Sequence, residues 1–521
     1  MSEDRQITRS AGVVGLFTLF SRILGLVRDA VVAAVFPKGS TDAFFVAYTI
    51  PNVLRRLLAE GSLTVAFIPV FTDTLEKGGT EAGRRMLSAM LGAVLLVLTV
   101  FVALGVAGAP WLVKAFAYGL SGDPAKFTLA VLLTRVMFLF LLSVGLTALA
   151  MGVLNTLRHF SAPALAPLVL NIFIISIVLA GRGVMASLGL PGITALALGV
   201  VVGGFGQVGL QLPFLRQKGM LVAPSLGLTH PGVLRVGMLM LPAVFGLAIY
   251  EVNVILSRQF ASFLPEGSIS YLYYAARLIE FPMGIFAVAM ATVSMPSLSS
   301  RASAGDMEGV KETYRHALRM VFFIILPASA GLGALAVPLA SVLFQRGQFS
   351  HAMAVETAVT LLGFLGGLWA GAGVRQTVPV FYAMQDTRTP VKVAALSLAV
   401  YAVAALLLHK PYATFGLGLA VACSSVANFL SLLWLLRQRL GPLGLGQVLN
   451  SVIRSAAAAA GCAAAAWAVA GTGVWSQGGA APRNYAVLLG AVAAGIMVYT
   501  VLCKVLKVPE LDTLVRSFRR R

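Results

Sequence analysis

Charged residues are scarce in this chain: of its 521 residues, only 11% are Asp, Glu, Lys or Arg. Soluble globular domains carry about 25% charged residues. Long polar stretches are also missing, because 59% of the residues are hydrophobic and the mean hydropathy is +0.90. This composition excludes a cytosolic enzyme, a disordered protein and a disulfide scaffold, and it predicts a polytopic membrane protein.

Cysteine and histidine are rare, and a nucleotide-binding motif is absent. The three cysteines, Cys423, Cys462 and Cys503, lie singly in apolar stretches, so we expect no disulfide and no CxxC metal site. The five histidines form no ligand cluster, and no GxxxxGK(S/T) phosphate-binding loop occurs. We therefore expect no metal, no cofactor and no catalytic activity. Any transport would be driven by an ion gradient, the membrane potential or consumption of the product.

The apolar residues form fourteen runs, each about as long as the roughly 20 residues that a membrane helix needs. They lie at about 11–36, 43–72, 87–117, 126–156, 161–181, 190–215, 231–262, 269–299, 315–344, 353–384, 391–408, 413–436, 452–471 and 484–506. The connections between them are short. The sequence thus predicts an all-α membrane protein with about 14 transmembrane helices and no soluble domain.

Lysine and arginine are distributed unevenly between the two sets of connections. The net charge is +20, and most of the loop cations, including the cluster between Lys504 and Arg521, belong to one set. The opposite set holds only Lys38, Lys126, Arg182, Arg346, Lys410 and Arg483. Because cytoplasmic loops carry the excess of Lys and Arg, we expect both termini to be cytoplasmic. The basic charge is then explained by orientation and anionic lipid, so no nucleic-acid partner is expected.

Four landmarks recur along the chain at an offset of 227 or 228 residues. The pairs are Gly39 and Gly267, Pro69 and Pro296, Pro110 and Pro338, and Pro163 and Pro390. This predicts two related six-helix lobes, at 1–225 and 226–440, followed by a C-terminal helix pair and a basic tail at 441–521. Duplicated bundles of this kind are typical of secondary transporters with a central binding site between the lobes, although channels are duplicated as well.

Charged side chains inside the apolar runs are the strongest functional signal, since each costs at least about 2.5–3.5 kcal/mol to insert. They gather in three runs. The first holds Arg22, Arg28 and Asp29, the second Arg55, Arg56 and Glu60, and the eighth Arg277 and Glu280, while Asp42 precedes the second. Local ion pairs, such as Arg56 with Glu60 or Arg277 with Glu280, would explain some of them structurally. Asp42 is compatible with a helix cap or with a gating role.

The count of these charges points beyond local pairing. Five arginines face three carboxylates, Asp29, Glu60 and Glu280, and uncompensated buried charge is costly. All five cations are arginine, whose planar guanidinium grips phosphate oxygens in a bidentate manner and stays charged when desolvated. We therefore expect a central cationic cavity that binds an anionic ligand, with a diphosphate as the natural candidate.

Several long segments resemble the MurJ/MviN family of lipid II flippases. The most specific are SRILGLVRDAVVAAVFPKGSTDAFFVAYTIPNVLRRLLAEGSLTVAFIPVF (21–71) and YYAARLIEFPMGIFAVAMATVSMPSLS (273–299). LNTLRHFSAPALAPLVLNI (154–172), LFQRGQF (343–349) and FYAMQDTRTPVKVA (381–394) are similar to further family blocks. The resemblance is collinear over roughly the whole chain. It implies the MOP-exporter fold, with two six-helix lobes around a central cavity and a C-terminal pair forming a groove for the lipid tail.

The resemblance also assigns roles to residues. Arg22, Arg28, Arg55 and Arg277 match the family's cavity arginines, and the further polar positions are matched by Asp29, Asp42, Arg56, Glu60 and Glu280. Two positions depart from the family pattern. Ala276 stands where many relatives have a polar residue, and Ser257 where some have an acid associated with a sodium site. Potential-driven and proton-coupled transport therefore stay open beside sodium coupling.

The function implied is translocation of lipid II, the undecaprenyl-diphosphate-linked disaccharide-pentapeptide, from the inner to the outer leaflet of the bacterial cytoplasmic membrane. Membrane lipids and the cell-wall synthesis machinery are the other expected partners. Alternatives of the same fold are a flippase for another lipid-linked oligosaccharide, of the O-antigen or capsule type, and a multidrug/cation antiporter. The antiporter would need an acidic cavity, which the basic surplus disfavours. A channel and a membrane scaffold are alternatives of other classes.

Overall fold

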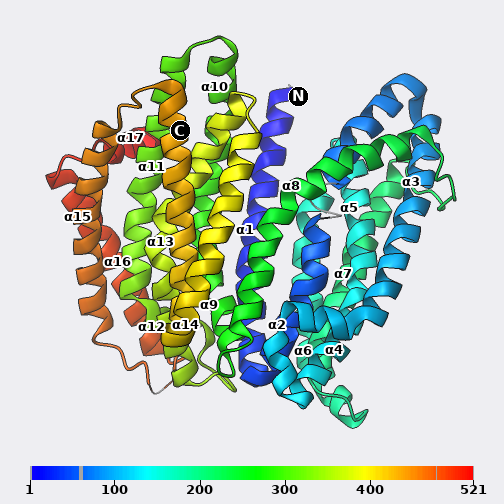
Figure 1. The fold of residues 1–521 in the computed structure, drawn as a ribbon, viewed down its shortest axis with the longest axis horizontal. Coiled ribbons are helices and arrows are strands. Elements are labelled where there is room, and N and C mark those ends of the chain that lie inside the picture. Colours follow the sequence, from blue (N-terminus) through cyan, green and yellow to red (C-terminus); the bar gives the residue numbers. More distant parts are fainter. Residues whose placement is uncertain (1–2, 58–62, 477, 520–521) are drawn as a thin grey trace. The chain divides into compact units, whose positions relative to one another are not determined.

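The computed structural model describes residues 3–57, 63–476 and 478–519. All the regular structure in these ranges is helical (Figure 1). Ten of the described helices are long and apolar enough to cross a membrane. The prediction of an all-helical, multi-span membrane protein is confirmed.

The chain divides into two compact units, residues 1–266 and 267–521. The first unit contains α1 (Glu3–Val35), α2 (Lys38–Arg55), α3 (Thr64–Phe116), the 3-10 turn η2 (Tyr118–Gly122), α4 (Pro124–Phe138), α5 (Phe140–Thr156), α6 (Ser161–Ser187), α7 (Thr194–Gln217) and α8 (Pro231–Ala261). Within it α8 is tied to η2, because the backbone N–H groups of Tyr118 and Gly119 donate to Gln259 and Ser262. These bonds explain why α8 belongs to the first unit, although the sequence places it after the expected boundary at residue 225.

The second unit begins at Gly267, whose left-handed backbone (φ 100°) precedes the first helix. It contains α9 (Ser268–Pro282), the π-helical turn η3 (Met283–Ala287), α10 (Val288–Ser303), α11 (Met307–Ala334), α12 (Ala336–Phe344), α13 (His351–Ala383), α14 (Arg388–Leu440), α15 (Leu445–Ala470), α16 (Pro482–Val505) and α17 (Pro509–Arg519). In Figure 1 the orange-to-red helices α15, α16 and α17 lie beside α11.

The two longest helices are hairpins rather than single rods. A continuous α14 of 53 residues would be about 80 Å long, more than twice a bilayer core of about 30 Å. Its backbone breaks at Ala413 (φ 47°), and beyond the break Ser424 Oγ donates to the carbonyl of Ser397 at 2.7 Å. In the same way α3 breaks at Gly79 (φ 70°), and Thr74 and Met86 contact each other across that break. Each element therefore supplies two antiparallel segments.

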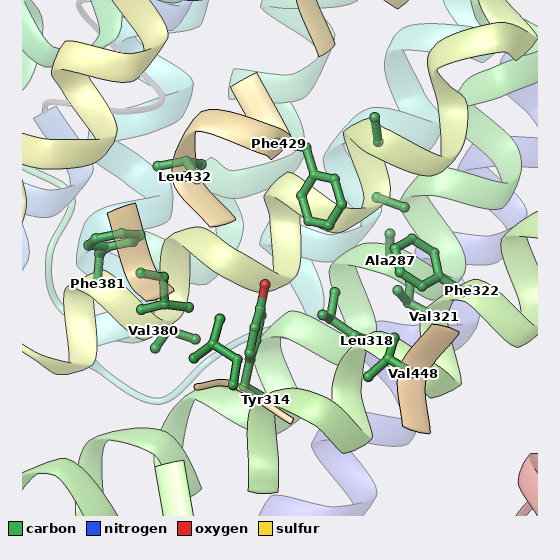
Figure 2. Packing of buried hydrophobic residues seen from close by; sticks show 14 of the residues in the cluster. Ala287, Tyr314, Leu318, Val321, Phe322, Val380, Phe381, Phe429, Leu432 and Val448 are labelled. Carbon is green, nitrogen blue, oxygen red and sulfur yellow. The ribbon is translucent and has the colours of Figure 1, made fainter. Parts of the chain in front are cut away.

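The core of the second unit is built around Tyr314 of α11. Its side chain is buried, and its hydroxyl lies 2.8 Å from Thr377 Oγ1 of α13. Figure 2 shows the surrounding cluster, to which α11 contributes Leu318 and Phe322, while α13 and α14 contribute further apolar side chains. This packing fixes α13 against α11, and α13 in turn contacts the helix that carries Arg277.

Glycine spacing predicts close helix contacts at two places, and the structure confirms both. A Cβ at Gly363 or Gly367 would collide with the backbone of α14 near Phe415 and Ala422. At Gly199 and Gly203 it would crowd the backbone of α6. These glycines therefore allow α13 and α14, and α6 and α7, to approach more closely than larger residues would permit.

Candidate functional site: arginines within the helices

Arg28 is held in a network between α1 and α6. Its Nε and Nη2 donate to Asp29 Oδ1 at 2.9 and 2.7 Å, and its Nη1 donates to Asn171 Oδ1 at 3.1 Å. The Asp29 side chain is only 3% exposed and that of Arg28 is 13% exposed. Arg28 is therefore paired with its neighbour Asp29. Asn171 adds a neutral acceptor from another helix.

Arg22 lies on the same helix in a different environment. Its side chain is exposed, and α1 continues without a break through Gly25. The first helix therefore does not bring the two guanidinium groups into one buried cluster. Arg22 is instead available at the surface of the first unit, where a ligand could be met first.

On α2 the structure excludes one of the two alternatives for Asp42, the helix cap. The helix begins at Lys38 after Pro37, so Asp42 lies in its second turn, where its side chain is 4% exposed. Further along α2, Arg55 Nε donates to Asn52 Oδ1 at 2.8 Å. Because the amide is neutral, it orients the guanidinium of Arg55 without cancelling its charge.

Arg56 forms an ion pair that joins two distant parts of the first unit. Its Nη1 lies 3.2 Å from Glu251 Oε1 of α8, 195 residues along the chain. The carboxylate is 4% exposed, whereas the Arg56 side chain is 36% exposed. Glu60, the partner expected from the i,i+4 spacing, lies outside the described residues. A buried carboxylate in an apolar helix needs a cation nearby, and Arg56 provides the positive charge beside Glu251.

In the second unit, α9 presents Arg277 and Glu280. The Nη1 of Arg277 donates to Glu280 Oε2 at 2.6 Å, so the predicted i,i+3 pair is confirmed. The carboxylate is 64% exposed and the guanidinium side chain 31% exposed. Exposed i,i+3 pairs contribute little, so the contact with Glu280 stabilises the position of Arg277 only weakly.

The structure changes the charge balance expected from the sequence. Glu251 and the buried Asp42 add two carboxylates that the sequence count omitted. With them the set has five arginines and five carboxylates, so the surplus of two positive charges counted from the sequence is not retained.

Sequence reasoning missed Asn52, Asn171 and the role of Glu251. Each is a polar residue inside an otherwise apolar helix, and each contacts an arginine of the candidate site. A lone polar residue in an apolar run is the sequence signal for such a contact, because polar groups at membrane depth require a partner. The sequence pattern does not say which arginine each would meet.

Comparisons with known proteins show the family to which the chain belongs. A family model described as "Lipid II flippase MurJ" matches residues 32–488. The chain is 38% identical over 444 residues to the probable lipid II flippase MurJ of Vibrio cholerae, covering 83% of each chain. It is 37% identical over 436 residues to the lipid II flippase MurJ of Burkholderia cenocepacia, covering 83% of this chain and 84% of the relative.

Solved structures show the same fold. A lipid II flippase MurJ in an inward closed conformation superimposes with a TM-score of 0.76 at 22% identity, covering 94% of this chain and 98% of the other. An inward-facing multidrug resistance transporter of the MATE family in the MOP superfamily reaches 0.69 at 13% identity, covering 84% and 99%. The helical fold together with the family model and these relatives defines a multi-span membrane transporter rather than an enzyme. Within that class, the chain belongs to the MurJ family of lipid II flippases.

Proposed function

We propose that this protein moves lipid II from the cytoplasmic to the outer leaflet of the bacterial cytoplasmic membrane by alternating access. The observation that carries the proposal is the arginine set of a MurJ-family chain, with Arg277 held by an exposed and exchangeable partner. The prenyl chain stays in the lipid while the diphosphate and its sugars enter the protein. No catalytic chemistry is involved.

The diphosphate is bound by arginines from three helices. Arg28, Arg55 and Arg277 grip its oxygens, and the exposed Arg22 receives it first. The other polar residues of the set, Asp29, Asp42, Arg56, Glu60 and Glu280, orient these arginines or hold them when no substrate is bound. Exchange of Glu280 for a phosphate oxygen gives the loaded state contacts that the empty state lacks. A ligand shifts a conformational equilibrium only by such differential contacts.

The architecture proposed for this cycle has fourteen crossings. They comprise two pseudo-symmetric six-helix lobes, 1–225 and 226–440, around a central cationic cavity, and a C-terminal pair within 441–521. The hairpins in α3 and α14 support this count, because each supplies two antiparallel segments. Left-handed residues also recur at the repeat offset, for example Arg158 (φ 57°) and Gln385 (φ 59°). The loop cations support the proposal that both termini are cytoplasmic.

A complementation assay tests the substrate and the site together. Bacteria depleted of their own lipid II flippase would receive this gene, and lipid II exposed on the outer leaflet would be measured by an externally added enzyme that cleaves it. We expect the native sequence to restore exposure. Arg277→Ala should lower it at least about tenfold, as expected when a charge-assisted contact is lost. The matched control is Arg437→Ala, which removes an exposed arginine at the end of α14.

Each result decides between the alternatives. If both Arg277→Ala and the native protein restore lipid II exposure, the proposed function is supported and the role of Arg277 in the site is rejected. Failure of the well-inserted native protein would reject lipid II and favour another lipid-linked oligosaccharide.

A further inference from the structure

The helix that carries Arg277 does not continue regularly past its proline. Pro282 ends α9, and the next five residues, Met283–Ala287, form a π-helical turn before α10 begins. The turn is closed by the N–H of Val288, which donates to the carbonyl of Met283, five residues earlier. Single π turns inside α-helices occur often at functional sites and need support from their surroundings.

A π turn holds one residue more than a turn of α-helix, and this extra residue decides which way Arg277 faces. An α-helix advances about 100° per residue, so one inserted residue rotates everything before it by about 100° relative to everything after it. Arg277 lies six residues before the turn, and α10 is fixed after it by the buried residues Ser294 and Leu298. If the turn reverted to a regular α-helix, Arg277 would move to a different face of its helix.

A buried glutamine from α13 contacts this turn. The Nε2 of Gln376 donates to the carbonyl of Ala287, the last residue of the π turn, at 2.8 Å. Gln376 is 2% exposed and Ala287 is fully buried in the cluster drawn in Figure 2. The same stretch of α13 reaches the start of the turn, because a Cβ at Gly371 would touch Met283. Thus α13 lies along the whole turn and bonds to its end.

The other half of the Gln376 amide shows that this bond is specific. Its Oε1 is buried and has no hydrogen-bond partner among the described residues. A buried polar atom without a partner is costly, so a residue that only filled space here would be apolar. Burial of Oε1 without a partner therefore costs free energy, and this cost is tolerated at a position where Nε2 donates to the carbonyl of Ala287.

We propose that Gln376 is a positioning residue for transport: it holds the π turn and thereby sets the face on which Arg277 meets the diphosphate. The predicted effect of Gln376 on transport rests on the proposed function, whereas its predicted effect on the orientation of Arg277 does not. Gln376 itself need not touch the substrate. It acts through the backbone of α9 and α10.

The test replaces the donor without changing the volume. Gln376→Met removes the bond and also the unpartnered oxygen, so Tm in detergent should stay level or rise. Lipid II exposure in the complementation assay should fall at least about tenfold, equivalent to about 1.4 kcal/mol. The matched control is Thr377→Val, which changes the next buried polar residue of α13, bonded to Tyr314 and not to α9, and should stay within about threefold. Gln376→Leu serves as a second variant if Gln376→Met fails to insert.

A labelling experiment reads the orientation of α9 without any substrate. Ala276→Cys, in a chain where the exposed Cys423 is replaced by Ser, would be reacted with a water-soluble maleimide in detergent. We expect Gln376→Met to change the labelling rate at least about threefold and Thr377→Val to leave it unchanged. An unchanged rate overturns the proposal even if transport falls, because transport would then be lost by another route. A changed rate in a protein that moves no lipid II supports the positioning role and rejects the proposed function alone.

Discussion

In the proposed internal repeat the helices α2 and α9 correspond to each other, yet their arginines are held in different ways. Arg56 of α2 reaches a nearly buried carboxylate, Glu251, on another helix 195 residues away. Arg277 of α9 pairs with an exposed carboxylate three residues away. Their positions also differ, because the 228-residue offset places Arg277 opposite Thr49. The two helices therefore correspond in the proposed repeat, whereas their charged contacts do not.

This difference separates an architectural pair from an exchangeable one. Breaking the Arg56 contact should loosen the packing of α2 against α8 within the first unit. Breaking the Arg277 contact should leave the packing of the second unit intact. The comparison can therefore be tested by mutating the carboxylates and measuring stability and transport separately.

The largest effect is expected for Glu251→Gln. Arg56 would lose its charged partner, and breaking a fully buried ion pair costs about 3–5 kcal/mol. Because the Arg56 side chain is 36% exposed, we expect a loss of about 2 kcal/mol in the free energy of unfolding. Thermal unfolding in detergent measures it. The double variant with Arg56→Gln should recover part of the loss, and a Tm shift no larger than that of Glu280→Gln would contradict the architectural role.

A second comparison concerns the turns that follow the fourth span of each half. Both contain a left-handed residue, Arg158 in one and Gln385 in the other, 227 residues apart. The next residue differs. The ring of His159 contacts that of Phe214 in a tilted arrangement, with centroids 4.7 Å apart, and burial together with the charge of Lys218 lowers the pKa of its imidazole. The first turn therefore favours an uncharged side chain.

In the second unit the turn uses a charge instead. Asp386 Oδ1 accepts hydrogen bonds from the N–H groups of Arg388 and Thr389, and Oδ2 pairs with Arg439 at 2.5 Å. Burial works against the carboxylate, but the bonds from Thr389 and the charge of Arg439 outweigh it and keep the pKa of Asp386 below its ordinary value of 3.8. Asp386 therefore caps the helix that follows this turn.

An intermediate effect is expected for Asp386→Asn, which keeps an acceptor for the cap but loses the ion pair with Arg439 and should cost about 1 kcal/mol at pH 7. Because the folded-state pKa is lowered, this stabilisation is present above the unfolded-state pKa and disappears as the pH falls through the folded-state value. The difference in stability between the two proteins should therefore begin to shrink below about pH 4 and vanish only below the folded-state pKa. A constant difference from pH 7 to pH 3 would show that the charge of Asp386 contributes nothing.

Local pattern explains what could be predicted from the sequence. The helices, the Arg277–Glu280 pair and the Asp386 cap depend on residues within four positions of each other, so spacing reveals them. The Arg56–Glu251 and Arg28–Asn171 contacts join residues 195 and 143 positions apart, and spacing does not say which helices become neighbours. The apolar run begins at residue 43, which made Asp42 a candidate cap. The helix itself begins earlier, at Lys38 directly after Pro37, so Asp42 lies inside it.

The smallest effect is expected for Glu280→Gln, and it tests the exchangeable pair most directly. An exposed i,i+3 ion pair is worth about 0.3–0.5 kcal/mol, so Tm should hardly change. If the role of Glu280 is to hold Arg277 until a phosphate replaces it, the variant should keep lipid II exposure within about threefold of the native level. Arg277→Ala in the same assay provides the contrast. A loss as deep as that of Arg277→Ala would mean that the carboxylate is itself required during transport. The Arg277–Glu280 pair of α9 would then not be a replaceable pair, and the contrast with the structural pair of α2 would fail.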